Sequence, residues 1–290
     1  NAFYSAFWRL LVKPFANSEG GFLPNPFGSG RVSLRSYLAL ANFKANHLNV
    51  VVTDIPACLF GLVTSSNPHD CSIAHVNVAL QITGAAVLDL LAAERAVMRF
   101  SGGAYQLLDK VLESFSLQGA SDFEAASTLQ MRVVSEQQIE QAALQMIGRA
   151  SAIDLAMFYL SDRDVVQALR AAAYAGVPVR VILDPNKDAF GHAKGGIPNR
   201  QVAEELLQTP GIRLRWAATH GEQFQSKMLL TRDSKGNASL LLGSANFTRR
   251  NLGDLNLELD AVVWGGAREP VLQRASAYFE RAWHNEGGMI

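Results

Sequence analysis

An internal repeat constrains the possible folds of this chain more than any other feature of its sequence. The first copy reads HLNVVVTD at 47–54, TSSN at 64–67 and NVAL at 77–80. The second copy reads QSKMLLTR at 225–232, GSAN at 243–246 and NLEL at 256–259. His47 and Asn67 are 20 positions apart, and Gln225 and Asn246 are 21 positions apart. From that asparagine to the next one, Asn77 or Asn256, the distance is 10 positions in both copies. Three matched anchors with the same strand character indicate a duplicated structural unit.

The pattern around the repeats predicts strands that alternate with helices. Short apolar or β-branched runs predict strands at 47–54, 60–64, 76–82, 152–159, 179–183, 212–217, 224–231, 240–242 and 257–263. Amphipathic periodicity predicts helices at 84–99, 135–149, 162–175, 201–208 and 270–283. The alternation predicts an α/β fold of two repeats, each a mixed β-sheet flanked by helices. We place the repeats at 1–120 and 121–290.

The two repeats are unequal ahead of their repeated segments. Predicted strands and helices fill residues 135–217 before the second copy, whereas only 46 residues precede His47. Residues 13–34 are rich in glycine, proline and asparagine, which predicts a long loop. We therefore expect the first repeat to be incomplete at its N-terminal side and the natural protein to extend beyond Asn1.

Composition argues against several classes of protein. Hydrophobic residues make up 49% of the 290 residues and charged residues 18%, which supplies a core and argues against disorder. Lys+Arg and Asp+Glu both number 26, so the chain lacks the basic surplus that binds nucleic acid by bulk charge. No apolar run is long enough for a transmembrane helix. The two cysteines, Cys58 and Cys71, cannot form a disulfide framework, and whether they pair stays open.

The repeated segments resemble the phospholipase D superfamily, whose motif H-x-K-(x)4-D is followed by G-S-x-N. The stretch LLGSANFTRRNLGDLNLELD is close to the family pattern, and NFKANH and TSSNPHD resemble its bacterial, cardiolipin-synthase-like branch. The resemblance covers about residues 31–285. It implies that both motifs line one site, where one histidine attacks phosphorus and the other moves a proton. It implies neither a metal nor any other cofactor.

The resemblance also assigns roles to individual residues. The H-x-K positions are held by His47 and Asn49 in the first repeat and by Gln225 and Lys227 in the second. Alternate residues of a strand point to one face, so each pair aims at the same substrate group. Imidazole is a nucleophile near neutral pH, and cationic or amide groups stabilise the phosphoryl oxygens. The expected substrate-binding residues are Ser65, Asn67, Ser244, Asn246 and Arg250, although Arg250 also fits a solvated or structural role.

Both motifs depart from the family pattern. Asn49 stands where lysine is expected, and Gln225 stands where the second histidine is expected. Arg232 occupies the aspartate position of the second motif, and Thr64 replaces the first glycine of one G-S-x-N turn. Glutamine can neither form a phosphohistidine nor deliver a proton at neutral pH, so a two-histidine mechanism would stall.

The family also has an acidic residue that orients each histidine. Glu258 fits this role in the second repeat, whereas Ala79 takes the aligned place in the first. We therefore expect Glu258 to face Gln225, and we infer that position 225 was histidine in a parent protein. Four of the other five histidines, which the sequence places mostly in loops or at the surface, are His69, His75, His192 and His220.

Three functions fit these residues. The first is a phosphodiesterase or phosphatidyltransferase that acts on phospholipid through a phosphohistidine, impaired by Gln225 and Asn49. This interpretation favours a bacterial, membrane-associated protein with peripheral lipid contact, and the aromatic residues at 1–12 form either a core helix or a lipid-facing surface. The second is a phospholipase D-type nuclease, which the neutral charge disfavours. The third is a non-catalytic module that retains the phosphate pocket.

Overall fold

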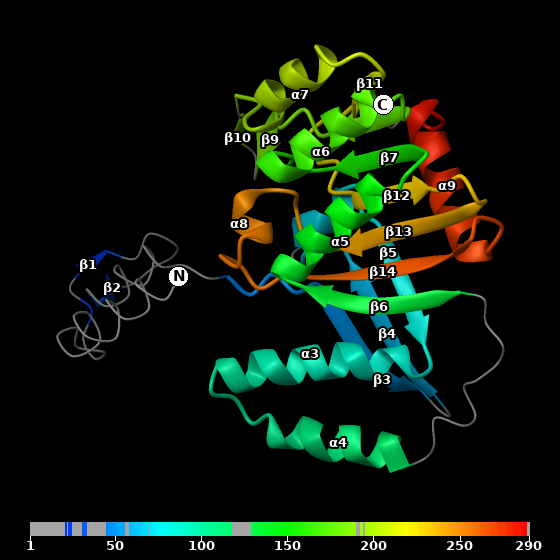
Figure 1. The fold of residues 1–290 in the computed structure, drawn as a ribbon. Helices are drawn as coiled ribbons and strands as arrows, with labels where there is room; N and C mark the ends of the chain where they lie inside the picture. The colour runs from blue at the N-terminus through cyan, green and yellow to red at the C-terminus, as the bar shows by residue number, and fades with distance from the viewer. Residues whose placement is uncertain are drawn as a thin grey trace. The chain divides into compact units, whose positions relative to one another are not determined.

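The computed structural model describes residues 21, 23–24, 31–33, 45–55, 58–68, 70–117, 129–189, 192–193 and 195–288. It divides into two compact units, 1–45 and 46–290. In the first unit β1 (Leu23–Pro24) pairs antiparallel with β2 (Arg31–Val32). The helix expected at 1–12 lies outside the described residues. All other described elements belong to the second unit (Figure 1).

A seven-stranded mixed sheet lies at the centre of the second unit (Figure 1). Its strand order is β11-β8-β7-β12-β13-β14-β6, with β7, β8 and β11 parallel and the remaining neighbours antiparallel. The strands are β6 (Gln130–Ser135), β7 (Ala152–Met157), β8 (Val179–Leu183), β11 (Ile212–Trp216), β12 (Lys227–Arg232), β13 (Asn237–Gly243) and β14 (Leu259–Gly266). The mixed sheet with flanking helices confirms the predicted fold class.

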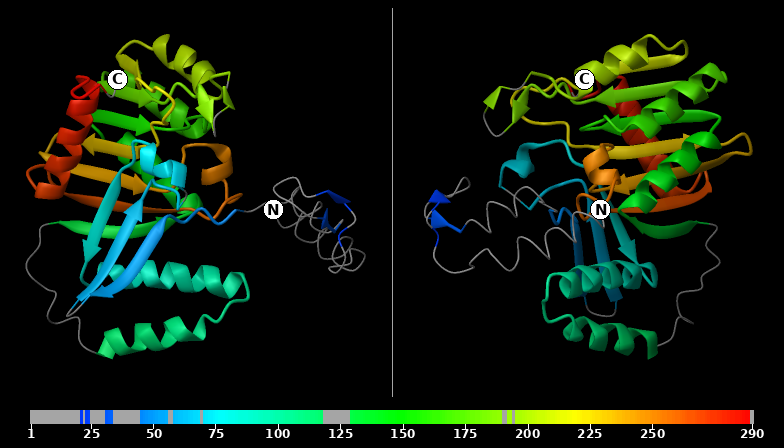
Figure 2. Two further views of the ribbon diagram at one scale, coloured as in Figure 1. Left: turned by 180° about the vertical axis from the view of Figure 1, so that it is seen from behind. Right: turned by 60° about the vertical axis from the view of Figure 1, so that its left-hand side comes forward.

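Each face of this sheet packs against its own layer (Figure 2). The first face is covered by α5 (Gln137–Gly148), α6 (Arg163–Tyr174) and α7 (Asn199–Leu207). The second face packs on α9 (Pro270–Trp283) and on a three-stranded sheet. Along β12 the alternation is strict, since Leu229 joins the first core and Met228 and Leu230 join the second.

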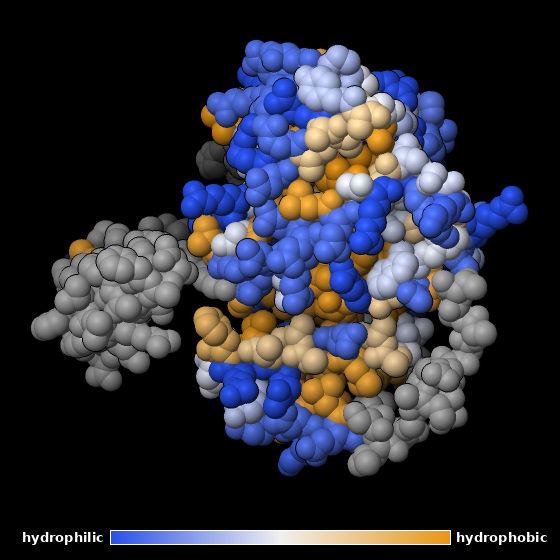
Figure 3. Space-filling model, viewed as in Figure 1, coloured by the Kyte–Doolittle hydropathy of each residue, from blue (hydrophilic) through white to orange (hydrophobic). Residues whose placement is uncertain are grey.

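The three-stranded sheet belongs to the first repeat and has the order β3-β4-β5. Its strands are β3 (Val50–Ile55), β4 (Cys58–Thr64) and β5 (Ala79–Thr83), all antiparallel, and a 3-10 turn η2 (Asp70–Ala74) precedes β5. The helices α3 (Ala86–Phe100) and α4 (Gln106–Leu117) follow, and apolar residues gather over them in Figure 3. Shorter elements of the second repeat are β9 (Asp188–Ala189), β10 (His192–Ala193) and α8 (Arg249–Leu252).

Several boundaries differ from the sequence prediction. The helix predicted at 135–149 begins two residues later, at Gln137, because Ser135 ends β6, and the side chain of its N-cap residue Glu136 makes no capping hydrogen bond. Asp162 does cap α6 by accepting from the backbone N–H groups of Asp164 and Val165. The sequence pattern assigned neither β6 nor α4, and α8 is a single turn.

The duplication is visible as the same strand–strand–strand–helix series in both repeats. β3, β4, β5 and α3 correspond to β12, β13, β14 and α9. The register makes the match residue by residue, since Thr64 pairs with Ala79 as Gly243 pairs with Asp260. Both repeats contribute to one shared core, and the proposed boundary near residue 120 lies outside the described residues. That boundary stays a prediction.

The register explains why Thr64 can replace the first glycine of its turn. A Cβ atom on Gly243 would overlap the Asp260 carboxylate and the Leu259 carbonyl oxygen. That carboxylate accepts the Ala245 backbone N–H at 3.0 Å. In the first repeat the opposite residue is Ala79, so there is room for a side chain, and the Thr64 hydroxyl accepts the Ser66 N–H at 3.1 Å. The two turns therefore satisfy the same backbone donor in two different ways.

Gly243→Thr should lower the free energy of unfolding by about 1–3 kcal/mol, because the new side chain overpacks the strand pair. Adding Asp260→Ala transplants the threonine–alanine pair of the first turn and should recover part of this loss. Urea unfolding of both single variants and the double variant measures the coupling. Additive losses would contradict the equivalence of the two turns.

Arg232, which replaces the motif aspartate, belongs to a buried charge network away from the G-S-x-N turn. Its Nη1 lies 2.7 Å from Asp154 Oδ2, and Arg180 Nε lies 2.6 Å from Asp154 Oδ1. Arg180 also pairs with Glu280 on α9. Asp154 is 1% exposed, so its charge is held by two guanidinium groups in place of water.

Asp154→Asn should destabilise the protein by about 3–5 kcal/mol, since it leaves two arginines without their buried partner. Chemical denaturation measures this loss. The matched control is Glu205→Gln, which breaks a more exposed pair with Arg163 and Arg170 and should change stability by about 0–1 kcal/mol. Equal effects of the two variants would contradict a structural role for the buried network.

Candidate active site at the junction of the repeats

Two short parallel bridges join the repeats and bring their motifs together. Asn46 bridges to Leu257, and Val76 bridges to Phe224. The backbone N–H of His47 donates to Leu257 O, and that of Val76 donates to Gln223 O, both at 2.9 Å. Asn46 and Phe224 each directly precede a motif position. Their partners, Leu257 and Val76, each lie just before the third strand of the other repeat. The motif residues of both repeats therefore meet at one place.

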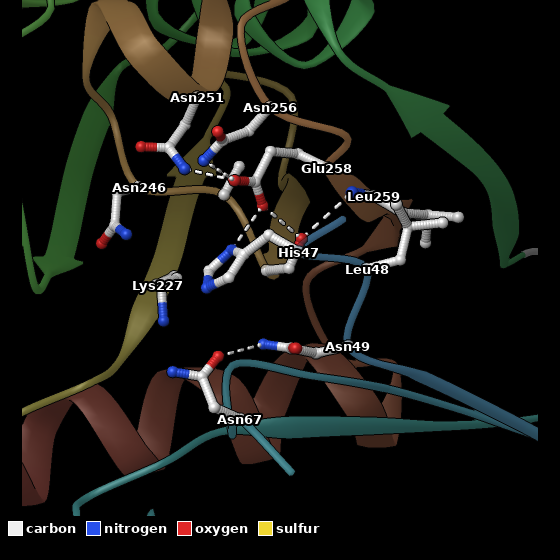
Figure 4. A network of polar contacts seen from close by, with 12 residues as sticks. His47, Leu48, Asn49, Asn67, Lys227, Asn246, Asn251, Asn256, Glu258 and Leu259 are labelled. Carbon is white, nitrogen blue, oxygen red and sulfur yellow. Dashed lines mark hydrogen bonds and ion pairs between the residues drawn. The ribbon is translucent and has the colours of Figure 1, made fainter. Parts of the chain in front are cut away.

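His47 and Glu258 form an ion pair or hydrogen bond across this junction (Figure 4). His47 Nδ1 lies 2.8 Å from Glu258 Oε2. A carboxylate accepts at this position, so Nδ1 carries the proton and Nε2 presents its lone pair. The imidazole is 25% exposed while Glu258 is fully buried. The pair thus offers an oriented, accessible nucleophilic nitrogen.

The buried Glu258 carboxylate is held from every side (Figure 4). Ser244 Oγ donates to Oε2 at 2.6 Å, and the side-chain amide of Asn256 donates to Oε1 at 3.3 Å. The Asn251 amide also donates to Oε1. These contacts replace the water that a buried carboxylate loses. Glu258 is therefore a fixed group that can orient His47.

This arrangement corrects the expectation that Glu258 faces Gln225, since the carboxylate contacts the histidine of the other repeat. It also corrects the expectation that Ala79 is the counterpart of Glu258 in the first repeat. Ser65 N donates to Val78 O as Ser244 N donates to Leu259 O, so the register places Asn77 where Glu258 stands. Ser65 Oγ accordingly contacts Asn77 Oδ1 at 3.4 Å. The loop that follows the G-S-x-N turn is two residues shorter in the first repeat than in the second. The sequence does not reveal this difference, because Asn67 and Asn77 have the same spacing as Asn246 and Asn256.

The half-site that corresponds to His47 and Glu258 therefore consists of two amides, Gln225 and Asn77. Gln225 is 5% exposed, and its Nε2 donates to Gln223 Oε1 at 2.7 Å. Its Oε1 is buried and has no hydrogen-bond partner among the described residues. Gln223 is not among the site residues that the sequence predicts. Its position two residues before Gln225 could have revealed it, because residues i and i+2 of a strand lie on the same face. An acceptor left open at the junction can receive a donor from a ligand.

Lys227 is the buried cation of the site. Its Nζ donates to Ser65 O at 3.0 Å and to Gln225 O at 3.4 Å, and it lies 5.8 Å from the centre of the Phe158 ring. Burial lowers the pKa of Lys227 to about 8, while the charges of Glu258 and Asp260 oppose this shift. Burial likewise raises the pKa of Asp260 to about 7. A cation at this position favours binding of an anion.

Two further amides border the same space (Figure 4). Asn49 Nδ2 donates to Asn67 Oδ1 at 3.1 Å, and Asn246 Oδ1 accepts the Tyr159 backbone N–H at 3.2 Å. Because the amide oxygens are used in this way, the NH2 groups of Asn67 and Asn246 remain oriented as donors. The figure shows both side chains around Lys227 and the ring of His47. Amide donors of this kind suit phosphoryl oxygens.

The remaining predicted substrate contacts lie slightly further back. Ser65 and Ser244 are fully buried, and their hydroxyls accept the backbone N–H groups of Val78 and Leu259. Arg250 lies on α8, and its Nε donates to Asn256 Oδ1 at 3.1 Å. These residues support the site, and their direct contact with a ligand stays a prediction.

Histidines outside the motifs do not complete a second catalytic pair among the described residues. The His220 side chain is 78% exposed beside Glu222. His75 Nδ1 accepts the Gln223 backbone N–H at 3.0 Å. His69 and the side chains of Cys58, Cys71 and His192 lie outside the described residues. In the described part of the chain no group of acidic, histidine or cysteine side chains has the geometry of a metal site, and no helix is long and apolar enough to span a membrane.

Comparisons with known proteins agree with this geometry. Residues 143–283 match the family described as cardiolipin synthase, phospholipase D-like domain. A search of curated proteins found no match. The phosphatidylserine synthase of Haemophilus influenzae is 11% identical with a TM-score of 0.58, over 85% of this chain and 63% of that one. The polyphosphate kinase of Porphyromonas gingivalis is 16% identical with a TM-score of 0.55, over 89% and 37%.

A third similar structure is Nuc from Salmonella typhimurium, titled a phospholipase D family member, which is 19% identical with a TM-score of 0.43 over 54% of this chain and 95% of that one. Residues 143–283 therefore carry a phospholipase D-like domain of the matched family, and the repeated strands and the junction between them support membership of the phospholipase D superfamily.

Proposed function

We propose that this chain is a phospholipase D-like phosphodiesterase or phosphatidyltransferase that acts on phospholipid with a single histidine. The observation that carries the proposal is the 2.8 Å contact between His47 Nδ1 and Glu258 Oε2. This contact leaves Nε2 as the nucleophile, and Glu258 stabilises the positive charge that the ring gains during attack. The P–O bond to the leaving group breaks as the P–N bond forms, so the product of the first step is a phosphohistidine at position 47.

The other side chains of the junction suit the phosphoryl group. Lys227 supplies positive charge, and the amides of Asn67 and Asn246 supply hydrogen bonds to the equatorial oxygens. Asn49, in place of the first motif lysine, holds Asn67 instead of adding charge. The site therefore has one cation where the family motif has two, and we expect weaker phosphate binding than in a complete site.

Phospholipid is the proposed substrate class on two grounds. The matched family is described as a cardiolipin synthase domain. The chain also has equal numbers of acidic and basic residues, which disfavours the long phosphate backbone of nucleic acid. Comparing the turnover of phospholipid in vesicles with the turnover of single-stranded DNA separates this proposal from a nuclease. The proposed enzyme would cleave only the phospholipid, and a nuclease would cleave only the DNA.

Gln225→His combined with Asn77→Glu should raise phosphodiesterase turnover by about 10²–10⁴-fold, the usual contribution of general acid–base catalysis. The two changes give the half-site of Gln225 and Asn77 the same histidine–acid pair that His47 and Glu258 form. Gln225→His alone should gain less, since its imidazole would face an amide. Release of the alcohol from phosphatidylglycerol vesicles measures the gain.

The matched control for this experiment is His220→Gln, which alters an exposed histidine and should leave turnover unchanged. His47→Gln in the double variant should remove the gained turnover, because the site then again holds a single imidazole. If His47→Gln keeps the gained activity, His47 is not the nucleophile and the proposal fails.

Anion binding should weaken as the pH rises above about 8, because Lys227 has its pKa lowered to about 8 and is neutral above it. The association constant for sulfate, whose charge is constant in this range, should fall by up to about tenfold per pH unit from 8 to 10. Calorimetric titration measures this dependence. Lys227→Met should bind sulfate weakly and without such a slope, whereas a slope that persists in that variant would assign the titration to another group.

A non-catalytic phosphate-binding module is the second candidate, and the paired amides Gln225 and Asn77 favour it. In that case His47 would be a ligand contact and no covalent adduct would form. Phosphorylation of His47 by any phosphodiester, detected in peptides by mass spectrometry, excludes this candidate.

A further inference from the structure

The junction is chemically one-sided. On the side of His47 stands an imidazole with its carboxylate at 2.8 Å. In the other half-site Gln225 takes the position that corresponds to His47. Its amide nitrogen donates to Gln223, and its amide oxygen has no partner among the described residues. An amide does not release a proton near neutral pH. The side from which a leaving group would take its proton therefore lacks a matched acid.

The titratable groups near this side are otherwise engaged. Asp184 Oδ2 accepts the Phe224 backbone N–H at 2.7 Å, and Asp260 Oδ1 accepts the Ala245 backbone N–H at 3.0 Å. Lys227 and His75 are engaged as well. Lys227 Nζ donates to the carbonyl oxygens of Ser65 and Gln225. His75 uses Nδ1 to accept the backbone N–H of Gln223. None of these groups occupies the place across from His47, because the register assigns that place to Gln225. Asn77, at the position of the orienting acid, carries no charge.

The missing proton matters differently for different leaving groups. An alkoxide is about as strong a base as hydroxide, so an alcohol leaves readily only when its oxygen is protonated. A phosphate group has a second pKa of about 6 and departs as a stable anion at neutral pH. Nothing in the second half-site needs to act on such a leaving group.

We propose, on the basis of the function proposed above, that the bond this site cleaves is a phosphoanhydride, in which the transferred group is joined to a second phosphate. The lone pair on His47 Nε2 attacks phosphorus, the P–N bond forms and the P–O bond to the second phosphate breaks. The electron pair of that bond leaves on the departing phosphate. The Nδ1 proton stays on the ring beside Glu258, so the step needs no external acid.

The site would thus prefer one class of leaving group, while His47 stays the nucleophile. A phosphatidyl group joined to a phosphate would transfer to His47, whereas an ordinary phosphatidyl ester of an alcohol would react slowly. Lys227, Asn67 and Asn246 contact the transferred phosphoryl group in both cases, so they do not separate the two bonds. The preference arises from Gln225 and Asn77 alone.

Three probes that share one methylphosphoryl group test the leaving-group preference. They are methyl diphosphate, methyl 4-nitrophenyl phosphate and dimethyl phosphate, and all three yield the same methylphosphoryl adduct on His47. Mass spectrometry of the full chain, followed by peptide mapping, measures how fast the adduct forms. We expect at least about 10²-fold faster labelling by the first two probes than by dimethyl phosphate.

Rebuilding the second half-site should remove this preference. In the Gln225→His, Asn77→Glu variant, labelling or turnover with dimethyl phosphate should rise by about 10²–10⁴-fold, while the rate with methyl diphosphate should change by less than about tenfold. His220→Gln is the matched control and should behave like the natural sequence. His47→Gln should give no adduct with any probe.

The outcomes separate the two proposals. Equal labelling by all three probes in the natural sequence would overturn the phosphoanhydride preference and show that Lys227, His75 or water supplies the proton. Absence of an adduct from every probe, in both the natural sequence and the rebuilt variant, would overturn the proposed function itself. Labelling by methyl diphosphate and not by dimethyl phosphate would support both.

Discussion

The interaction on which the site depends is the contact of the buried Glu258 carboxylate with His47 of the other repeat. A fully buried carboxylate requires donors on both oxygens, and here the donors come from Ser244, Asn251, Asn256 and the imidazole. Three of these groups belong to the second repeat and one to the first. The contact therefore couples the docking of the repeats to the orientation of the nucleophile, so a loss of docking would also misplace His47.

The repeat and its strands could be predicted because their signals are local. The short apolar run at 224–231 and the G-S-x-N turns are local patterns, and the structure confirms the strands they predict as β12 and β13. The partner of His47 could not be predicted in this way. Equal spacing between Asn67 and Asn77 and between Asn246 and Asn256 suggested an alignment without gaps. The hydrogen-bond register shows two residues fewer in the first loop, which changes the counterpart of Glu258 from Ala79 to Asn77.

Substitutions in the two repeats make sense only as pairs. Thr64 opposite Ala79 and Gly243 opposite Asp260 each satisfy one turn N–H, and mixing them leaves a clash or an open donor. Gln225 and Asn77 likewise stand together where the other half-site has His47 and Glu258. Sequence inspection detects each departure separately, whereas the register shows which departures compensate one another. The motif position Arg232 is a similar case, because the buried Asp154 neutralises it from the neighbouring strand β7.

This pairing gives a physical reason why one half-site is intact while the other is not. Replacing His47 alone would remove a donor from a buried carboxylate, which costs several kcal/mol unless Glu258 changes as well. The half-site of Gln225 and Asn77 holds no buried carboxylate, so exchange among neutral side chains there leaves no uncompensated charge. Stability thus protects the pair of His47 and Glu258 and leaves the half-site of Gln225 and Asn77 free to vary. For the function proposed above, a site under this constraint would keep the capacity to form a phosphohistidine longer than the capacity to protonate an alcohol.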